Sequence, residues 1–168
     1  MEEIDDEEGD QLEWRDTYFI LFQQSGRPTL TQVEAAITDS ARRITLENLE
    51  ADEDGMFESL LVQAPEDHSA LEISYETGDA VIEQSAALAK QLRGEATADQ
   101  LKKLLRADAR LDVMHFERVS AADAFDGDDD QEFGGEAVDP ASLLNVVEAL
   151  AKLTKGLPID PASGAILT

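Results

Sequence analysis

The sequence contains few residue patterns that could support catalysis or metal binding. The clearest is an acidic run in which Asp126, Asp128 and Asp130 occupy alternate positions, as at the start of a calcium-binding loop. An EF-hand loop also needs glycine at its sixth position and glutamate at its twelfth, where this chain has Gln131 and Ala137. The three aspartates are therefore candidate ligands for a divalent cation, while a plain solvated linker is the favoured interpretation.

The chain has two histidines, and neither has a second histidine at a metal-binding spacing. His68 lies among turn residues, which indicates a surface position. His115 lies in an apolar run, where a lone histidine is more often a hydrogen-bonded packing residue than a base. The sequence also has no Gly-x-Ser-x-Gly motif and no phosphate-binding glycine-rich loop. We therefore predict no catalytic residue and no cofactor.

Positive charge is concentrated in one segment, where Lys102, Arg106 and Arg110 recur at every fourth residue with Lys103 beside them. Residues four apart share a helix face, so a basic stripe is expected as far as a helix extends. Ordinary surface charge explains it most simply. The alternative is that the stripe receives an acidic segment of this chain or of a second copy, which a basic partner could displace.

A second candidate for anion binding is the segment 24–28, which contains Gly26, Arg27 and Pro28. Backbone donors and Arg27 could bind an anion between a strand and a helix. Such a connection also needs glycine and proline simply to turn, and we favour the turn.

The net charge limits the classes of partner. The 168 residues include 38 acidic and only 13 basic side chains, a formal net charge of −25. This field repels phosphate backbones and anionic lipids and attracts basic proteins, so neither direct nucleic-acid binding nor membrane binding is expected. A salt-rich environment is an alternative explanation for the acidity. The absence of cysteine, an acidic start and the lack of a long apolar run favour a soluble, cytoplasmic protein.

Hydrophobic periodicity predicts a single core with acidic segments outside it. We expect a disordered acidic tail over 1–13, an α+β core over 14–119, an acidic flexible loop or linker over 120–138, and a C-terminal helix and tail over 139–168.

Within the core, the pattern predicts alternating strands and helices. Strands are expected at 17–22, 44–47, 56–62, 71–75 and 111–116, and helices at 29–41, at 79–92 and from 97. This order predicts an α+β fold with a mainly antiparallel sheet and helices on one face, distantly ferredoxin-like.

The C-terminal helix has the clearest boundary signals in the chain. Asp139 and Pro140 suit its start, and Gly156 suits its end, with Lys152 and Lys155 in the final turn. Its apolar stripe, which includes Leu143, Val147 and Leu150, must pack against this domain's own sheet or against another chain. We therefore treat these three residues, with Lys102, Arg106 and Arg110, as candidate contacts for a protein partner or for self-association.

Three classes of function fit these observations. A non-catalytic adaptor or regulatory protein-interaction domain is favoured, because catalytic motifs are missing and the acidity lies outside the core. The second is an acidic decoy that imitates nucleic acid for a basic protein. The third is a small-ligand domain or enzyme with a dispersed site, which predicts a concave pocket containing a perturbed carboxylate or His115.

Overall fold

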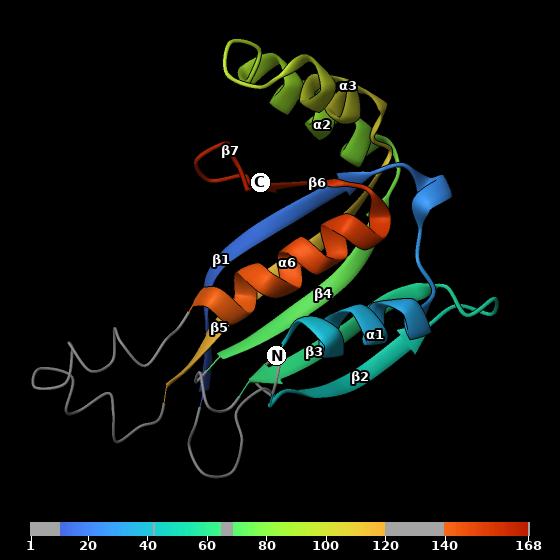
Figure 1. Cartoon of the computed structure of the whole chain (residues 1–168), viewed down its shortest axis with the longest axis vertical. Helices are drawn as coiled ribbons and strands as arrows, with labels where there is room; N and C mark the ends of the chain where they lie inside the picture. The colour runs from blue at the N-terminus through green and yellow to red at the C-terminus, as the bar shows by residue number, and fades with distance from the viewer. Residues whose placement is uncertain (1–10, 42, 65–68, 120–139, 168) are drawn as a thin grey trace, which may run out of the picture.

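The computed structural model describes residues 11–41, 43–64, 69–119 and 140–167. Most of the predicted tail, the whole predicted loop 120–138 with Asp126, Asp128 and Asp130, and His68 lie outside these ranges. The described residues form an α+β fold (Figure 1). Its strands are β1 (Gln11–Phe22), β2 (Thr45–Ala51), β3 (Phe57–Ala64), β4 (Ser69–Thr77), β5 (Ala109–Val119), β6 (Leu157–Asp160) and β7 (Ala165–Ile166). Its helices are η2 (Gln24–Gly26), α1 (Leu30–Ser40), α2 (Asp79–Gln91), α3 (Ala98–Arg106) and α6 (Pro140–Thr154).

The seven strands form one antiparallel sheet in the order β2-β3-β4-β5-β1-β6-β7. This confirms the predicted class and the mainly antiparallel sheet. The helix starts follow local chemistry, because Thr29 and Thr97 each form a capping box with the glutamine three residues later. The predicted helices and strands between residues 17 and 116 are all present, with boundaries that differ by a few residues.

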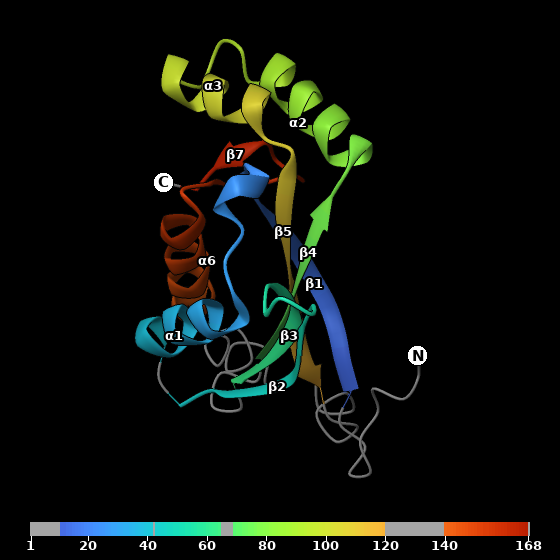
Figure 2. The same cartoon turned by 90° about the vertical axis from the view of Figure 1, so that its right-hand side faces the viewer.

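Helices cover both faces of the sheet. Successive side chains of a strand point to opposite faces, and on β1 the side chains of Ile20 and Phe22 pack with α1 and α6, whereas Leu21 packs with α2 and α3. In Figure 2, α1 and α6 lie together against one face, and α2 and α3 lie at one end of the sheet. The helices are thus divided between two faces, in place of the single helical layer that the sequence suggested.

The C-terminal helix belongs to the main core. Leu143, Val147 and Leu150 are 5%, 1% and 0% exposed and pack in the same cluster as Ile20 of β1. Their prediction as partner contacts is therefore corrected: the sheet of this domain already covers the apolar stripe of α6. The chain then returns along β1 as β6, pairing Leu157 with Leu21.

Two strand features were not predicted. β1 begins at Gln11, so its first residues fall within the range assigned to the disordered tail. β6 and β7 are only four and two residues long, and β6 contains Pro158, which cannot donate a backbone hydrogen bond. Such short segments carry too little periodicity to be recognised before their neighbours are known.

Candidate binding pockets beside α3 and α6

The structure divides the predicted basic stripe. Lys102, Lys103 and Arg106 are exposed on α3, but the helix ends at Arg106 and Arg110 lies on β5. A strand that begins at Ala109 turns the chain away from the helix axis, so spacing by fours no longer implies a common face. The stripe, expected as far as the helix extends, therefore ends at Arg106 and does not include Arg110.

A pocket lies beside the basic face of α3, and we call it the α3 pocket. Its volume is about 490 Å³. Its cationic lining is Lys102, Lys103, Arg106 and Lys155, and among the described residues its single carboxylate is that of Asp99. The remaining lining comes from the end of β1, from η2 and from Thr154. Two helix ends and the end of a central strand therefore position four cations around one hollow.

A second, more apolar hollow runs along α6, and we call it the α6 groove. Its volume is about 900 Å³. Leu144 is 43% exposed there, although it lies on a helix whose opposite face is fully buried. Lys103 and Lys155 line the groove as well as the α3 pocket, so the two hollows adjoin. The apolar lining consists of Leu144, Val147, Ala151, Pro158 and Leu167, and the other charged lining residues are Glu148 and Lys152.

The local charge of these hollows is opposite to that of the protein. Among the described residues, their linings contain five lysines and arginines and only two acidic residues. Lys152 forms an ion pair with Glu148 on the same helix, at 3.6 Å. Within the described ranges, the other four cations form no ion pair. A surface that concentrates unpaired cations on a strongly acidic protein is suited to an anionic ligand.

The end of α6 places Lys155 at the junction of the two hollows. Lys155 has a positive φ of 58°, and the Gly156 amide donates to the Ala151 carbonyl at 2.9 Å, as in a Schellman cap. Glycine usually takes the left-handed position, because a side chain there costs about 1 to 2 kcal/mol. In this chain the glycine is the following residue, Gly156, because a Cβ there would lie 2.8 Å from the Leu21 carbonyl oxygen. Lys155 therefore keeps a strained backbone beside both hollows.

The guanidinium of Arg27 is engaged by the protein itself and is not presented to an external anionic ligand. Its guanidinium donates to the Phe57 carbonyl at 2.9 Å, pairs with Asp52 at 3.3 Å and lies over the ring of Tyr75. These contacts tie the connection after β1 to β3 and β4. The interpretation of the segment as a structural turn is therefore supported, although Gly26 lines the α3 pocket.

Arg110 forms a separate cluster across the sheet from α6. Its guanidinium lies 4.2 Å from the centre of the Phe19 ring, pairs with Asp112 and donates to Gln84 of α2. Burial raises the pKa of Asp112 above its ordinary value, and the neighbouring guanidinium opposes that shift. Neither Arg110 nor Asp112 lines the α3 pocket or the α6 groove. The cluster thus joins β5 to α2.

A third group of polar residues lies on the α6 face of β1 and β5. A bulge between Trp14 and Asp16 shifts the register of β1, so that Asp16 lies opposite His115. His115 is 7% exposed, and its Nδ1 lies 3.2 Å from Oδ1 of Asp16. This fits the interpretation of His115 as a hydrogen-bonded packing residue. Neither hollow beside α3 and α6 is lined by His115.

Tyr18 belongs to the same group, and its titration is a test of the local structure. Burial, together with the carboxylates of Asp16 and Asp160, raises the pKa of its phenol to about 12. An unfolded tyrosine loses its proton near 10. We therefore expect this group's contribution to stability to be complete below pH 10 and to be lost as the pH rises through about 12.

The measurement is an ultraviolet titration of the phenols, with circular dichroism confirming that the chain remains folded. We expect an ionisation step near 12 that the Tyr18→Phe variant lacks and the Tyr75→Phe variant keeps. A step near 12 that survives in Tyr18→Phe would show that it does not come from Tyr18, and would contradict the burial of this phenol beside the two carboxylates.

Neither a metal-binding cluster in the described residues nor similarity to known proteins identifies a function for this chain. Among the described residues, no group of three or more His, Cys, Asp or Glu could hold a metal ion. No helix in the described part of the chain is long and apolar enough to cross a membrane. Comparison with family models, with curated proteins and with solved structures finds no match. The function proposed below therefore depends on the two hollows.

Sequence reasoning found three of the five cations but not the site. Lys102, Lys103 and Arg106 were singled out by their spacing, whereas Lys152 and Lys155 were interpreted only as end signals of the last helix. Favourable charge at a helix C-terminus explains each of them separately. Their gathering depends on the path from α6 into β6, which no local pattern indicates.

Proposed function

We propose that this protein is a non-catalytic protein-interaction domain, and that the α6 groove docks a partner segment carrying both acidic and apolar side chains. The observation that carries the proposal is the composition of the groove. The exposed side chain of Leu144 supplies its apolar contact, whereas Val147, Ala151 and Pro158 line it from buried positions. Lys103 and Lys155 supply its positive charge, and Lys152 is paired with Glu148. An acidic peptide with an apolar anchor matches both features.

The proposal changes the expected chemistry of the partner. The net charge of −25 favoured a basic protein, but the groove is the place where the local charge is reversed. The overall charge then contributes selectivity, since it repels nucleic acid and anionic lipid surfaces away from the groove. A cytoplasmic location is part of this proposal, because a chain without cysteine suits a reducing compartment.

The test uses fluorescence anisotropy with the full chain and three labelled peptides. A peptide of glutamate and leucine is expected to bind, a glutamate–serine peptide to bind more weakly, and a lysine–leucine peptide not to bind. We expect Lys103→Glu to weaken binding of the glutamate–leucine peptide about three- to tenfold, since it reverses a cation at the edge of the groove. Leu144→Ser, which removes an exposed apolar contact, is expected to weaken it similarly.

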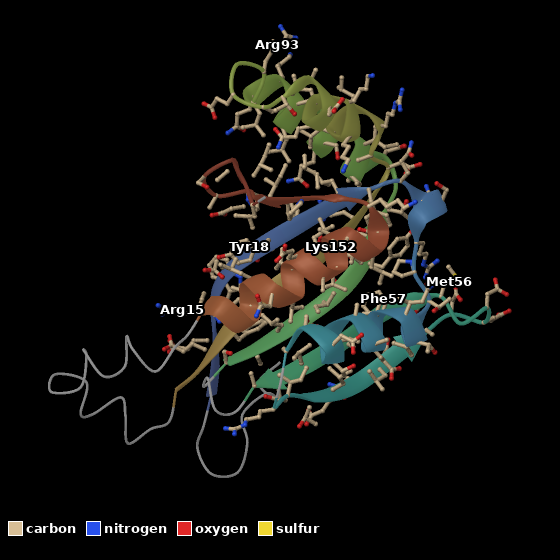
Figure 3. All side chains as sticks on the ribbon, viewed as in Figure 1. Arg15, Tyr18, Met56, Phe57, Arg93 and Lys152 are labelled. Atoms are coloured by element: carbon tan, nitrogen blue, oxygen red, sulfur yellow. The ribbon has the colours of Figure 1, made fainter. Side chains whose placement is uncertain are left out.

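Arg93→Glu is the matched control, because it changes the net charge equally. Arg93 lines neither hollow. It lies at the tip of the α2–α3 pair, away from the groove residue Lys152 on α6 (Figure 3). Equal losses for Lys103→Glu and Arg93→Glu would mean that only the overall field acts, and would contradict a groove. Binding of the lysine–leucine peptide alone, reversed by salt or by DNA, would favour the acidic decoy instead.

A further inference from the structure

We infer that the α3 pocket is a separate site for a small molecule carrying several negative charges, of the polyphosphate class. The pocket is defined by Lys102, Lys103 and Arg106 of α3 and by Lys155 after α6. Lys102 and Arg106 line this pocket and not the α6 groove. The inference therefore does not rest on peptide docking, and the two can fail independently.

The arrangement of cations around the pocket has an electrostatic cost. Lys102 and Arg106 are four residues apart on one helix, where like charges destabilise each other. Within the described residues neither has an ion-pair partner, and Asp99 is the single carboxylate in the pocket lining. Bound anionic oxygens would replace this repulsion with attraction.

Helix-end chemistry accounts for only part of the cluster. Lys103 and Arg106 lie in the last turn of α3, where a cation is favourable in any protein. Lys155 directly follows the last residue of α6, where a cation is also favourable. Lys102 lies before the last turn of α3, so helix-end chemistry does not account for it. Lys102 is therefore the cation whose position a ligand would explain.

The shape of the pocket also suits a small molecule. A volume of about 490 Å³ lies within the range of small-molecule sites and exceeds what a single inorganic ion needs. One wall is closely packed, because a Cβ on Gly26 would lie 2.9 Å from the Thr154 carbonyl oxygen. This close approach holds η2 against the end of α6, and Ser25 of η2 adds a hydroxyl to the lining. Four cations around such a hollow match several anionic groups on one molecule.

Isothermal titration calorimetry of the full chain with pyrophosphate tests the inference. The buffer contains no divalent cation, because metal ions would bind both the pyrophosphate and the acidic protein, and ionic strength is kept constant. We expect saturable binding with a stoichiometry near one. The pair Lys102→Gln with Arg106→Gln is expected to weaken binding at least tenfold, since each residue supplies a charge-assisted contact.

The matched control is the pair Lys90→Gln with Arg93→Gln, which removes the same charge from exposed residues outside both hollows. Equal weakening by the two pairs, or heat that never saturates, would overturn the inference. Leu144→Ser separates the two proposals, because it is expected to weaken peptide binding and to leave pyrophosphate binding unchanged. Loss of both activities in Leu144→Ser would contradict separate sites.

Discussion

Replacing Leu150 with alanine is expected to lower the free energy of unfolding by about 2 to 5 kcal/mol, as deletion of a buried leucine side chain does in a packed core. Leu150 is 0% exposed and lies among residues of the sheet and of α1. The loss combines the transfer of apolar surface to water with the cavity that remains. Denaturant unfolding monitored by circular dichroism measures it, provided that the transition has a single step.

Leu144→Ala is the control for that experiment, because it makes the same change on the same helix. Leu144 is 43% exposed, so its loss is expected to alter stability by less than about 1 kcal/mol. A large difference between the two variants would establish α6 as part of the core. Similar small effects would mean that α6 separates easily from the sheet, and would return Leu143, Val147 and Leu150 to consideration as partner contacts.

Gly156→Ala is expected to lower the free energy of unfolding by about 1 to 3 kcal/mol, the usual cost of forcing a methyl group into a packed site. The new Cβ would lie 2.8 Å from the Leu21 carbonyl oxygen and 2.9 Å from Cγ2 of Ile20. Both atoms belong to a central strand, so neither can move away without disturbing the sheet. Thermal and denaturant unfolding measure the effect.

Gly94→Ala provides the comparison. A Cβ on Gly94 would meet no atom within 4 Å, and a substitution at such a site is expected to change stability by no more than about 0.5 kcal/mol. If Gly156→Ala were equally harmless, the close approach between the end of α6 and β1 would be absent in solution. The position of Lys155 at the junction of the two hollows would then lose its structural basis.

The helices were predictable because their signals are local. Thr29 and Thr97 stand where a side-chain oxygen can accept the first free amides, and a glutamine three residues later completes each capping box. The strand periodicity between residues 44 and 116 was equally local. β6 was not predicted, because a segment of four residues that includes a proline is too short to show the alternation of apolar and polar residues typical of a strand.

The sequence indicated some of the residues that line the two hollows, but not that these residues lie together. Spacing placed Lys102 and Arg106 on one helix face, and that inference needed only the helix. It does not reach Arg110, because the helix ends at Arg106 and β5 begins at Ala109. A charge pattern can be extended along the chain only as far as the secondary structure continues.

By itself, the sequence determined the composition, the net charge and the apolar face of each long element. These properties depend on residue type and on spacings of a few residues, within which backbone geometry leaves little freedom. What each apolar face covers depends on the three-dimensional fold, in which α6 packs on the sheet of its own chain.

Tertiary structure also decided which polar groups meet. The bulge in β1 brings Asp16 to His115, 99 residues away, and the close approach at Gly156 brings Lys155 to the cations of α3. Periodicity specifies that a face is buried, but not its partner, whereas electrostatic and hydrogen-bonding interactions depend on distance through space. The hollows beside α3 and α6 therefore exist only in the folded chain.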